Sequence, residues 1–123
     1  MRPTFDEVVY STLHLVPPAE QKEIYAQLVY ESGRAASEIG LWLLDPKGAS
    51  RVDEKNVTCP VLVISGTEDR IVPSSVVRKV AKKYEMVSTY REFEHHAHWV
   101  VGEPDWQEIT DYIYQWLKQT SGG

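Results

Sequence analysis

The sequence predicts a mixed α/β fold in which helices come first and a β-α-β-α unit with parallel strands follows. The first part of the chain has apolar residues at helical spacing, with prolines and glycines between the helical stretches. The second part has two short β-branched runs, 59–65 and 88–94, separated by an amphipathic helical pattern. A helix between two strands is the usual connection between parallel neighbours, so we expect both strands to point the same way.

Length and composition describe one compact globular domain rather than a membrane or nucleic-acid-binding protein. The chain has 123 residues, of which 42% are hydrophobic and 25% charged, and its formal net charge is −5. A negative chain repels nucleic acid and anionic membranes, so we expect neither as a partner. Cys59 is the single cysteine and is compatible with a reducing compartment. With no long apolar span or targeting segment, we expect a cytoplasmic location.

Two helices are expected at the N-terminus. Thr4 and Glu7 form a capping-box pattern, which predicts a helix that ends near Leu15. Pro18 is placed as a first-turn proline of a second helix, for which Gly33 offers a stop.

A third helix is expected over 35–44, and its many apolar residues predict that it is buried against something large. Residues 45–56 have turn and charge chemistry without periodicity, which indicates a connection. We therefore divide the chain into a helical segment, 1–50, and an α/β unit, 51–120.

In the α/β unit, Ser74 or Ser75 is expected to cap the helix between the strands. This helix should turn its apolar residues inward, namely Val76, Val77, Val80, Ala81 and Tyr84. Asp105 and Glu108 form a second capping-box pattern, which predicts a last helix packed on the sheet.

Asp69 and His98 each follow the carboxyl end of a predicted strand. Because parallel strands end at one edge of a sheet, and that edge is where open α/β sheets bind ligands, we expect these side chains to come within hydrogen-bond reach. A carboxylate bonded to one imidazole nitrogen fixes the tautomer and supports the imidazolium that forms when the other nitrogen takes a proton.

Three stretches resemble the C-terminal portion of the α/β-hydrolase family: "CPVLVISGTEDRIVP", the turn "HHAHW" and the last helix ending in "YIYQWLK". The resemblance covers about residues 57–118. It implies that Asp69 is the triad acid and His98 the triad base, and that residues 1–50 correspond to a helical cap. It also implies a partial α/β-hydrolase fold, which we expect oligomerisation to complete.

The family's nucleophile is missing from the sequence. The family places its serine in a Gly-x-Ser-x-Gly turn, and no two glycines of this chain stand four apart. Ser65 belongs to the strand end that leads to the acid turn, and Cys59 lies at the opposite end of the same strand, so neither is expected to replace the serine. We expect a truncated chain without the first six strands.

The same residues also have interpretations other than the catalytic one. Asp69 alone would be a common turn residue, and Glu68 is expected to be a solvated neighbour. His95, His96 and His98 could suggest a metal site, but no further ligand completes the set, so we expect no metal and no cofactor, with His95 and His96 exposed beside the turn.

The expected function is that of a hydrolase-like chain which retains the acid and histidine of a serine carboxylic-ester hydrolase and is inactive alone. The alternatives are one subunit of a split serine esterase or lipase, acting on a small ester when complemented, or a non-catalytic assembly or binding module. We expect a homodimer, since two parallel strands are too few to be stable alone.

Overall fold

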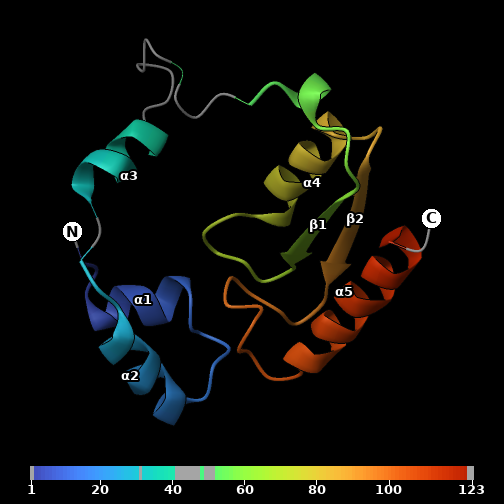
Figure 1. Ribbon diagram of the computed structural model, residues 1–123. Coiled ribbons are helices and arrows are strands. Elements are labelled where there is room, and N and C mark those ends of the chain that lie inside the picture. Colours follow the sequence, from blue (N-terminus) through green and yellow to red (C-terminus); the bar gives the residue numbers. More distant parts are fainter. Residues whose placement is uncertain (1, 31, 41–47, 49–51, 122–123) are drawn as a thin grey trace.

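The computed structural model describes residues 2–30, 32–40, 48 and 52–121. Figure 1 shows two groups of elements, a helical group at the N-terminus and a group around a small sheet at the C-terminus, with helix α3 set apart from both. The described part is thus mixed α/β, with helices before a β-α-β-α unit, as the sequence predicts.

The first helix, α1 (Phe5–Ser11), begins with the predicted capping box. Thr4 Oγ1 accepts the backbone N–H of Glu7 at 3.4 Å, and the Glu7 carboxylate accepts the backbone N–H of Thr4 at 2.8 Å. The helix ends at Ser11 rather than near Leu15, since Leu13 turns into the core and is fully buried.

The second helix, α2 (Pro18–Gln27), starts at the predicted proline but ends six residues before Gly33. Leu28 adopts an extended backbone, with φ −68° and ψ 135°, and packs against the N-terminal core. This core consists of buried Val8, Leu13 and Val16, with Ile24, Tyr25, Leu28 and Trp99 packed around it.

Gly33, predicted to stop a helix, instead begins the third one, α3 (Gly33–Gly40). The expected apolar end of this helix, 41–44, lies outside the described residues, as does most of the predicted connection 45–56. The described end of that connection is a short 3-10 helix, η2 (Glu54–Asn56).

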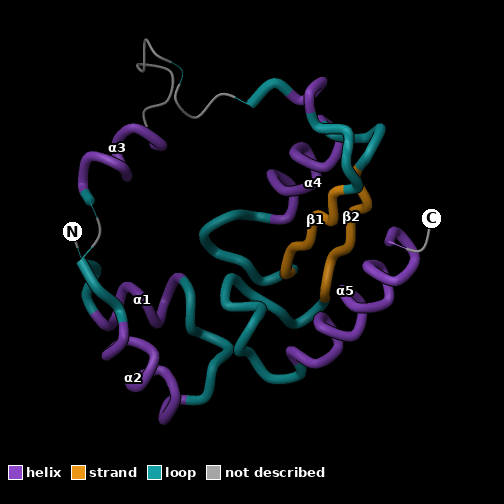
Figure 2. The backbone as a smooth tube through the Cα atoms, in the orientation of Figure 1, coloured by secondary structure: helices purple, strands orange, loops and turns teal. Residues whose placement is uncertain are grey.

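The sheet has two parallel strands in the described residues, β1 (Val61–Gly66) and β2 (Ser88–Phe93), which confirms the predicted direction. The register runs from Val61 opposite Ser88 to Gly66 opposite Phe93, so both strands end at one edge. Figure 2 shows the loops that follow the strands emerging at this edge.

Helix α4 (Ser74–Lys83) joins the strands, and its start differs from the expected cap. The cap position is held by Pro73, and the Ser74 hydroxyl donates instead to the carbonyl of Gly66 at 2.9 Å. Only part of the expected apolar face turns inward: Ala81 is buried, whereas Val76 and Val80 are 44% and 45% exposed.

The last helix, α5 (Trp106–Ser121), also starts without the expected capping box. Asp105 has a φ of 64°, which is incompatible with the extended backbone of an ordinary N-cap. The expected packing on the sheet is confirmed, since Trp116 Nε1 donates to Thr89 Oγ1 at 3.1 Å and Tyr112 packs edge-on against Phe93.

Helices α4 and α5 cover opposite faces of the sheet. Along β2, Tyr90 and Glu92 reach the α4 side, where Glu92 pairs with Arg78, while Thr89 and Phe93 contact α5. Successive side chains of a strand point to opposite faces, so this alternation fixes one helix on each.

Candidate functional site

Two loops meet at the carboxyl edge of the sheet and are joined by backbone hydrogen bonds. The Thr67 N–H donates to the carbonyl of Phe93, and the Glu68 N–H donates to the carbonyl of His96, both at 2.9 Å. The His95 N–H donates to Thr67 Oγ1 at 3.2 Å. These bonds hold the backbone of the turn after β1 against the backbone of the turn after β2.

Asp69 and His98 form the hydrogen bond expected from the sequence. His98 Nδ1 donates to Asp69 Oδ2 at 2.9 Å. The other carboxylate oxygen, Oδ1, accepts the backbone N–H groups of Ile71 and Val72 at 2.8 and 2.9 Å. Asp69 therefore has two roles: it stabilises the turn after β1, as aspartate often does in turns, and it is the hydrogen-bond partner of His98.

The exposure of the two side chains suits a base held by a buried acid. The Asp69 side chain is 8% exposed and that of His98 is 39% exposed. Within the described part of the chain, His98 Nε2 has no hydrogen-bond partner. The ring nitrogen that does not contact Asp69 can thus meet a reacting group.

The surroundings of Asp69 keep its carboxyl group ionised. Burial alone would raise the pKa, but the hydrogen bonds from the Val72 N–H, the His98 ring and the Ile71 N–H outweigh burial and lower the pKa of Asp69 below its ordinary value. Ionised Asp69 accepts a hydrogen bond from Nδ1–H, which leaves Nε2 as the basic nitrogen of a neutral ring.

The sequence-based expectation for His95 and His96 is right for one and wrong for the other. His95 is exposed, and its Nδ1 lies 3.5 Å from Oε1 of Glu68, which is itself partly exposed as expected. His96 is only 2% exposed, and its Nδ1 lies 3.1 Å from Glu103 Oε2. The reason is the positive φ of His95, 59°, at the point where the chain leaves the direction of β2.

Glu103 is the residue of this site that sequence reasoning missed. It is 1% exposed, and its two oxygens accept the Ala97 N–H at 2.7 Å and the Trp99 N–H at 2.8 Å. The sequence gives little signal for this role, because an acid between Gly102 and Pro104 is typical of an exposed loop.

Gly66 is required by the close approach of the two loops. A Cβ atom at this position would collide with the His96 carbonyl and lie 2.6 Å from the carbonyl oxygen of Ala97. Only glycine allows β1 to end this close to the turn that carries His98.

Neither of the two candidates for a substitute nucleophile, Ser65 and Cys59, has a hydrogen bond to His98. Ser65 is 4% exposed, and its hydroxyl is 2.8 Å from that of Tyr90, on the sheet face covered by α4. Cys59 is exposed and precedes β1 at the amino edge. No described serine, threonine or cysteine hydrogen-bonds to His98.

The N-terminal helices are attached beside the candidate site. Trp99, the residue after His98, packs against the N-terminal core. Arg70, the residue after Asp69, donates from its guanidinium to the carbonyl of Tyr10 at 2.9 Å and lies over the Tyr10 ring. Both neighbours of the Asp69–His98 pair thus contact the helical segment.

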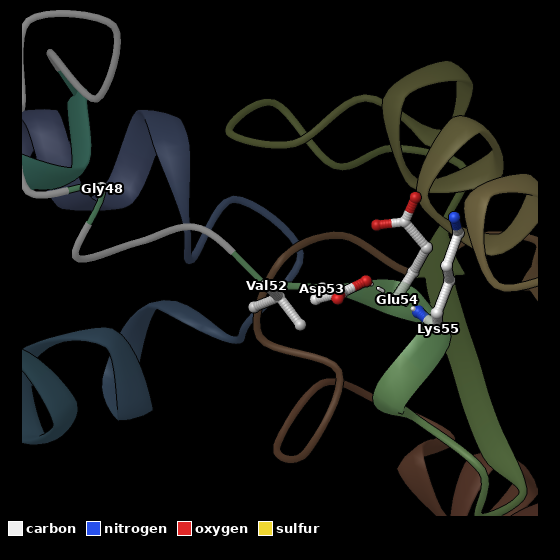
Figure 3. Close-up of a pocket in the computed structure, with 5 residues that line it drawn as sticks. All are labelled: Gly48, Val52, Asp53, Glu54 and Lys55. Carbon is white, nitrogen blue, oxygen red and sulfur yellow. Dashed lines mark hydrogen bonds between the residues drawn. The ribbon is translucent and has the colours of Figure 1, made fainter.

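A pocket elsewhere in the structure is separate from this site. Figure 3 shows Gly48, Val52, Asp53, Glu54 and Lys55 lining it, beside η2. Glu54 pairs with Lys83 at 3.3 Å, at the end of α4, which places the pocket at the amino edge of the sheet. It therefore lies away from Asp69 and His98.

The described residues contain no cluster of three or more histidine, cysteine, aspartate or glutamate side chains that could hold a metal ion. They also contain no helix long and apolar enough to cross a membrane.

Comparison with known proteins gives no relative: no family model, no curated protein and no solved structure matches the chain.

Proposed function

We propose that Asp69 and His98 are the acid and base of a serine carboxylic-ester hydrolase, and that the serine comes from a segment which this sequence does not contain. The observation that carries the proposal is the bond of 2.9 Å between His98 Nδ1 and a buried carboxylate, together with an unpartnered Nε2. The chain alone is then inactive toward esters.

In the proposed reaction, Nε2 of His98 takes the proton of the serine hydroxyl while the serine oxygen attacks the ester carbonyl carbon. The imidazolium that results is stabilised by ionised Asp69. It then gives its proton to the leaving alkoxide, which departs as an alcohol and leaves an acyl-enzyme. Water, deprotonated by the same nitrogen, then attacks the acyl carbon, and the imidazolium returns this proton to the serine oxygen as the carboxylic acid is released.

The position of the N-terminal helices supports a cap over the ester substrate. The residues that follow Asp69 and His98 contact helix α1 and the core that it forms with the loop after it, so this segment lies beside the Asp69–His98 pair. In the family that this chain resembles, helices of this kind form a cap over the substrate. We assign the same role to residues 1–50.

The test is hydrolysis of an activated ester by the purified chain, with and without the protein encoded by the neighbouring reading frame. The chain alone should show no His98-dependent activity. The complemented chain should lose activity by about 10⁴-fold or more on His98→Asn, a loss typical of a triad histidine. The matched control is His95→Asn, which changes an exposed histidine three positions away and should have little effect, since asparagine tolerates the positive φ of His95.

Two outcomes would contradict the proposal. A burst of product from the chain alone, lost on His98→Asn, would mean that it holds its own nucleophile. Complementation without any His98-dependent hydrolysis would favour the non-catalytic binding module, because the pair would then have only its structural role.

A further inference from the structure

The turn that carries His98, residues 95–99, is organised around one buried carboxylate. Glu103 is 1% exposed and accepts three hydrogen bonds from this turn. The donors are the Ala97 N–H at 2.7 Å, the Trp99 N–H at 2.8 Å and His96 Nδ1 at 3.1 Å. A buried carboxylate with several short bonds is a strong constraint on the groups that donate to it.

The two backbone bonds lie on either side of His98. The donors belong to the residue before His98 and the residue after it, and they reach different oxygens of the same carboxylate. The peptide groups flanking His98 are therefore fixed relative to one rigid group. Because the Cα of His98 lies between them, the direction in which its side chain leaves the turn is fixed as well.

We infer that Glu103 is a positioning residue for His98: its buried carboxylate holds the backbone on both sides of the histidine and so keeps the ring on Asp69. The inference rests on the proposed function, since it assigns Glu103 a part in the same site. Glu103 touches neither Asp69 nor the free Nε2, and it acts through the backbone alone. The carboxylate form is needed, because an amide has one acceptor oxygen and a donor group that would oppose an N–H.

The test is the tautomer of His98 in the full chain, measured by nitrogen-15 NMR of the ring well above the ordinary histidine pKa of about 6.5. In the unsubstituted chain, the contact with Asp69 should make the Nδ1–H form the major one. In Glu103→Gln, the ring should leave Asp69 and the Nε2–H form should become the major one. A residue that served only to stabilise the core would not change the tautomer in a variant that remains folded.

Glu108→Gln is the matched control, since it removes the same charge from an exposed position five residues further along and should leave the tautomer unchanged. A folded Glu103→Gln that keeps the Nδ1–H form would overturn the inference and leave the proposed function standing. Absence of the Nδ1–H form from the unsubstituted chain would instead overturn the proposed function.

If Glu103→Gln does not fold, a second measurement tests whether Glu103 holds the backbone on both sides of His98. Scalar couplings across hydrogen bonds should connect the Ala97 and Trp99 nitrogens to the side-chain carboxyl carbon of Glu103 in the unsubstituted chain. Both couplings, found together with the Nδ1–H form of His98, support the inference. Their absence overturns it, whatever the tautomer.

Discussion

At the scale of single residues, Asp69 joins a structural and a chemical role. One oxygen closes the turn after β1 by accepting two backbone N–H groups, and the other accepts His98 Nδ1. Hydrogen bonds that involve an ionised partner are stronger than neutral ones, so the charge of Asp69 should contribute to stability as well as to the site.

We expect Asp69→Asn to lower the free energy of unfolding by about 1–3 kcal/mol at neutral pH, since asparagine keeps the turn but loses the charge. The pKa of Asp69 is lowered by folding, so the stabilisation is present above the ordinary carboxyl pKa of about 3.9 and is lost as the pH falls through the lowered value. Denaturant unfolding from neutral pH into acid measures this difference.

Asp111→Asn is the control, because it removes the same charge from an exposed position on α5 and should leave stability almost unchanged. If the gap between Asp69→Asn and the unsubstituted chain stayed constant into acid, the charge of Asp69 would not be its cause.

At the same scale, the sequence predicts the contact between Asp69 and His98 but not the buried residues Glu103 and His96 beside it. The pair follows from topology, since two parallel strands must end at one edge and each strand is followed by one of the residues. Glu103 and His96 are buried polar groups that satisfy each other and nearby backbone donors. Such burial depends on how two loops pack, and residue type alone gives the opposite expectation.

At the scale of elements, local chemistry predicts a helix start only where tertiary contacts do not compete. The Thr4 and Glu7 pattern forms because both partners are exposed and within one turn. Ser74 does not cap α4, because its hydroxyl bonds to the carbonyl of Gly66 and Pro73 holds the cap position. Helix α2 ends before the predicted stop at Gly33 for a similar reason, since Leu28 leaves the helix and packs against the core.

The link between α1 and α2 depends on a buried glutamine, for which the sequence gives no signal. Gln21 is 9% exposed, and its Nε2 donates to the carbonyls of Leu13 at 3.0 Å and Val16 at 2.8 Å. These carbonyls belong to the residues that bring the loop into the core. The Leu13 carbonyl also accepts the Val16 N–H, so the amide side chain takes the place of a missing backbone partner at Val16.

Gln21→Leu should lower the free energy of unfolding by about 1–3 kcal/mol, because it leaves the carbonyl of Val16 without its donor and removes one of the two donors to the carbonyl of Leu13. Gln27→Leu is the matched control, since Gln27 is exposed at the end of the same helix and the change should have a small effect. Thermal or denaturant unfolding of the two variants gives the comparison. Equal effects of the two changes would show that the bonds of Gln21 contribute little.

At the scale of the whole molecule, the described chain has little core for its size. Its buried apolar residues are Val8, Leu13, Val16, Ala81, Phe93, Ala97 and Ile109. Several large apolar side chains of the described residues are exposed instead, including Val76 and Val80 on α4.

The sheet also has open edges, because β1 and β2 are each paired on one side only within the described residues. An open strand edge offers unpaired backbone groups to another chain, and a sheet of two strands is seldom stable by itself. We therefore expect a homodimer, formed by extending the sheet or by exchanging the N-terminal helices, because a two-fold axis lets one surface cover its own copy. Sedimentation at micromolar concentration should give a mass twice the 14.1 kDa of one chain. A well-folded monomer under these conditions would show that the chain covers this surface itself, and the argument from the open sheet would then be wrong.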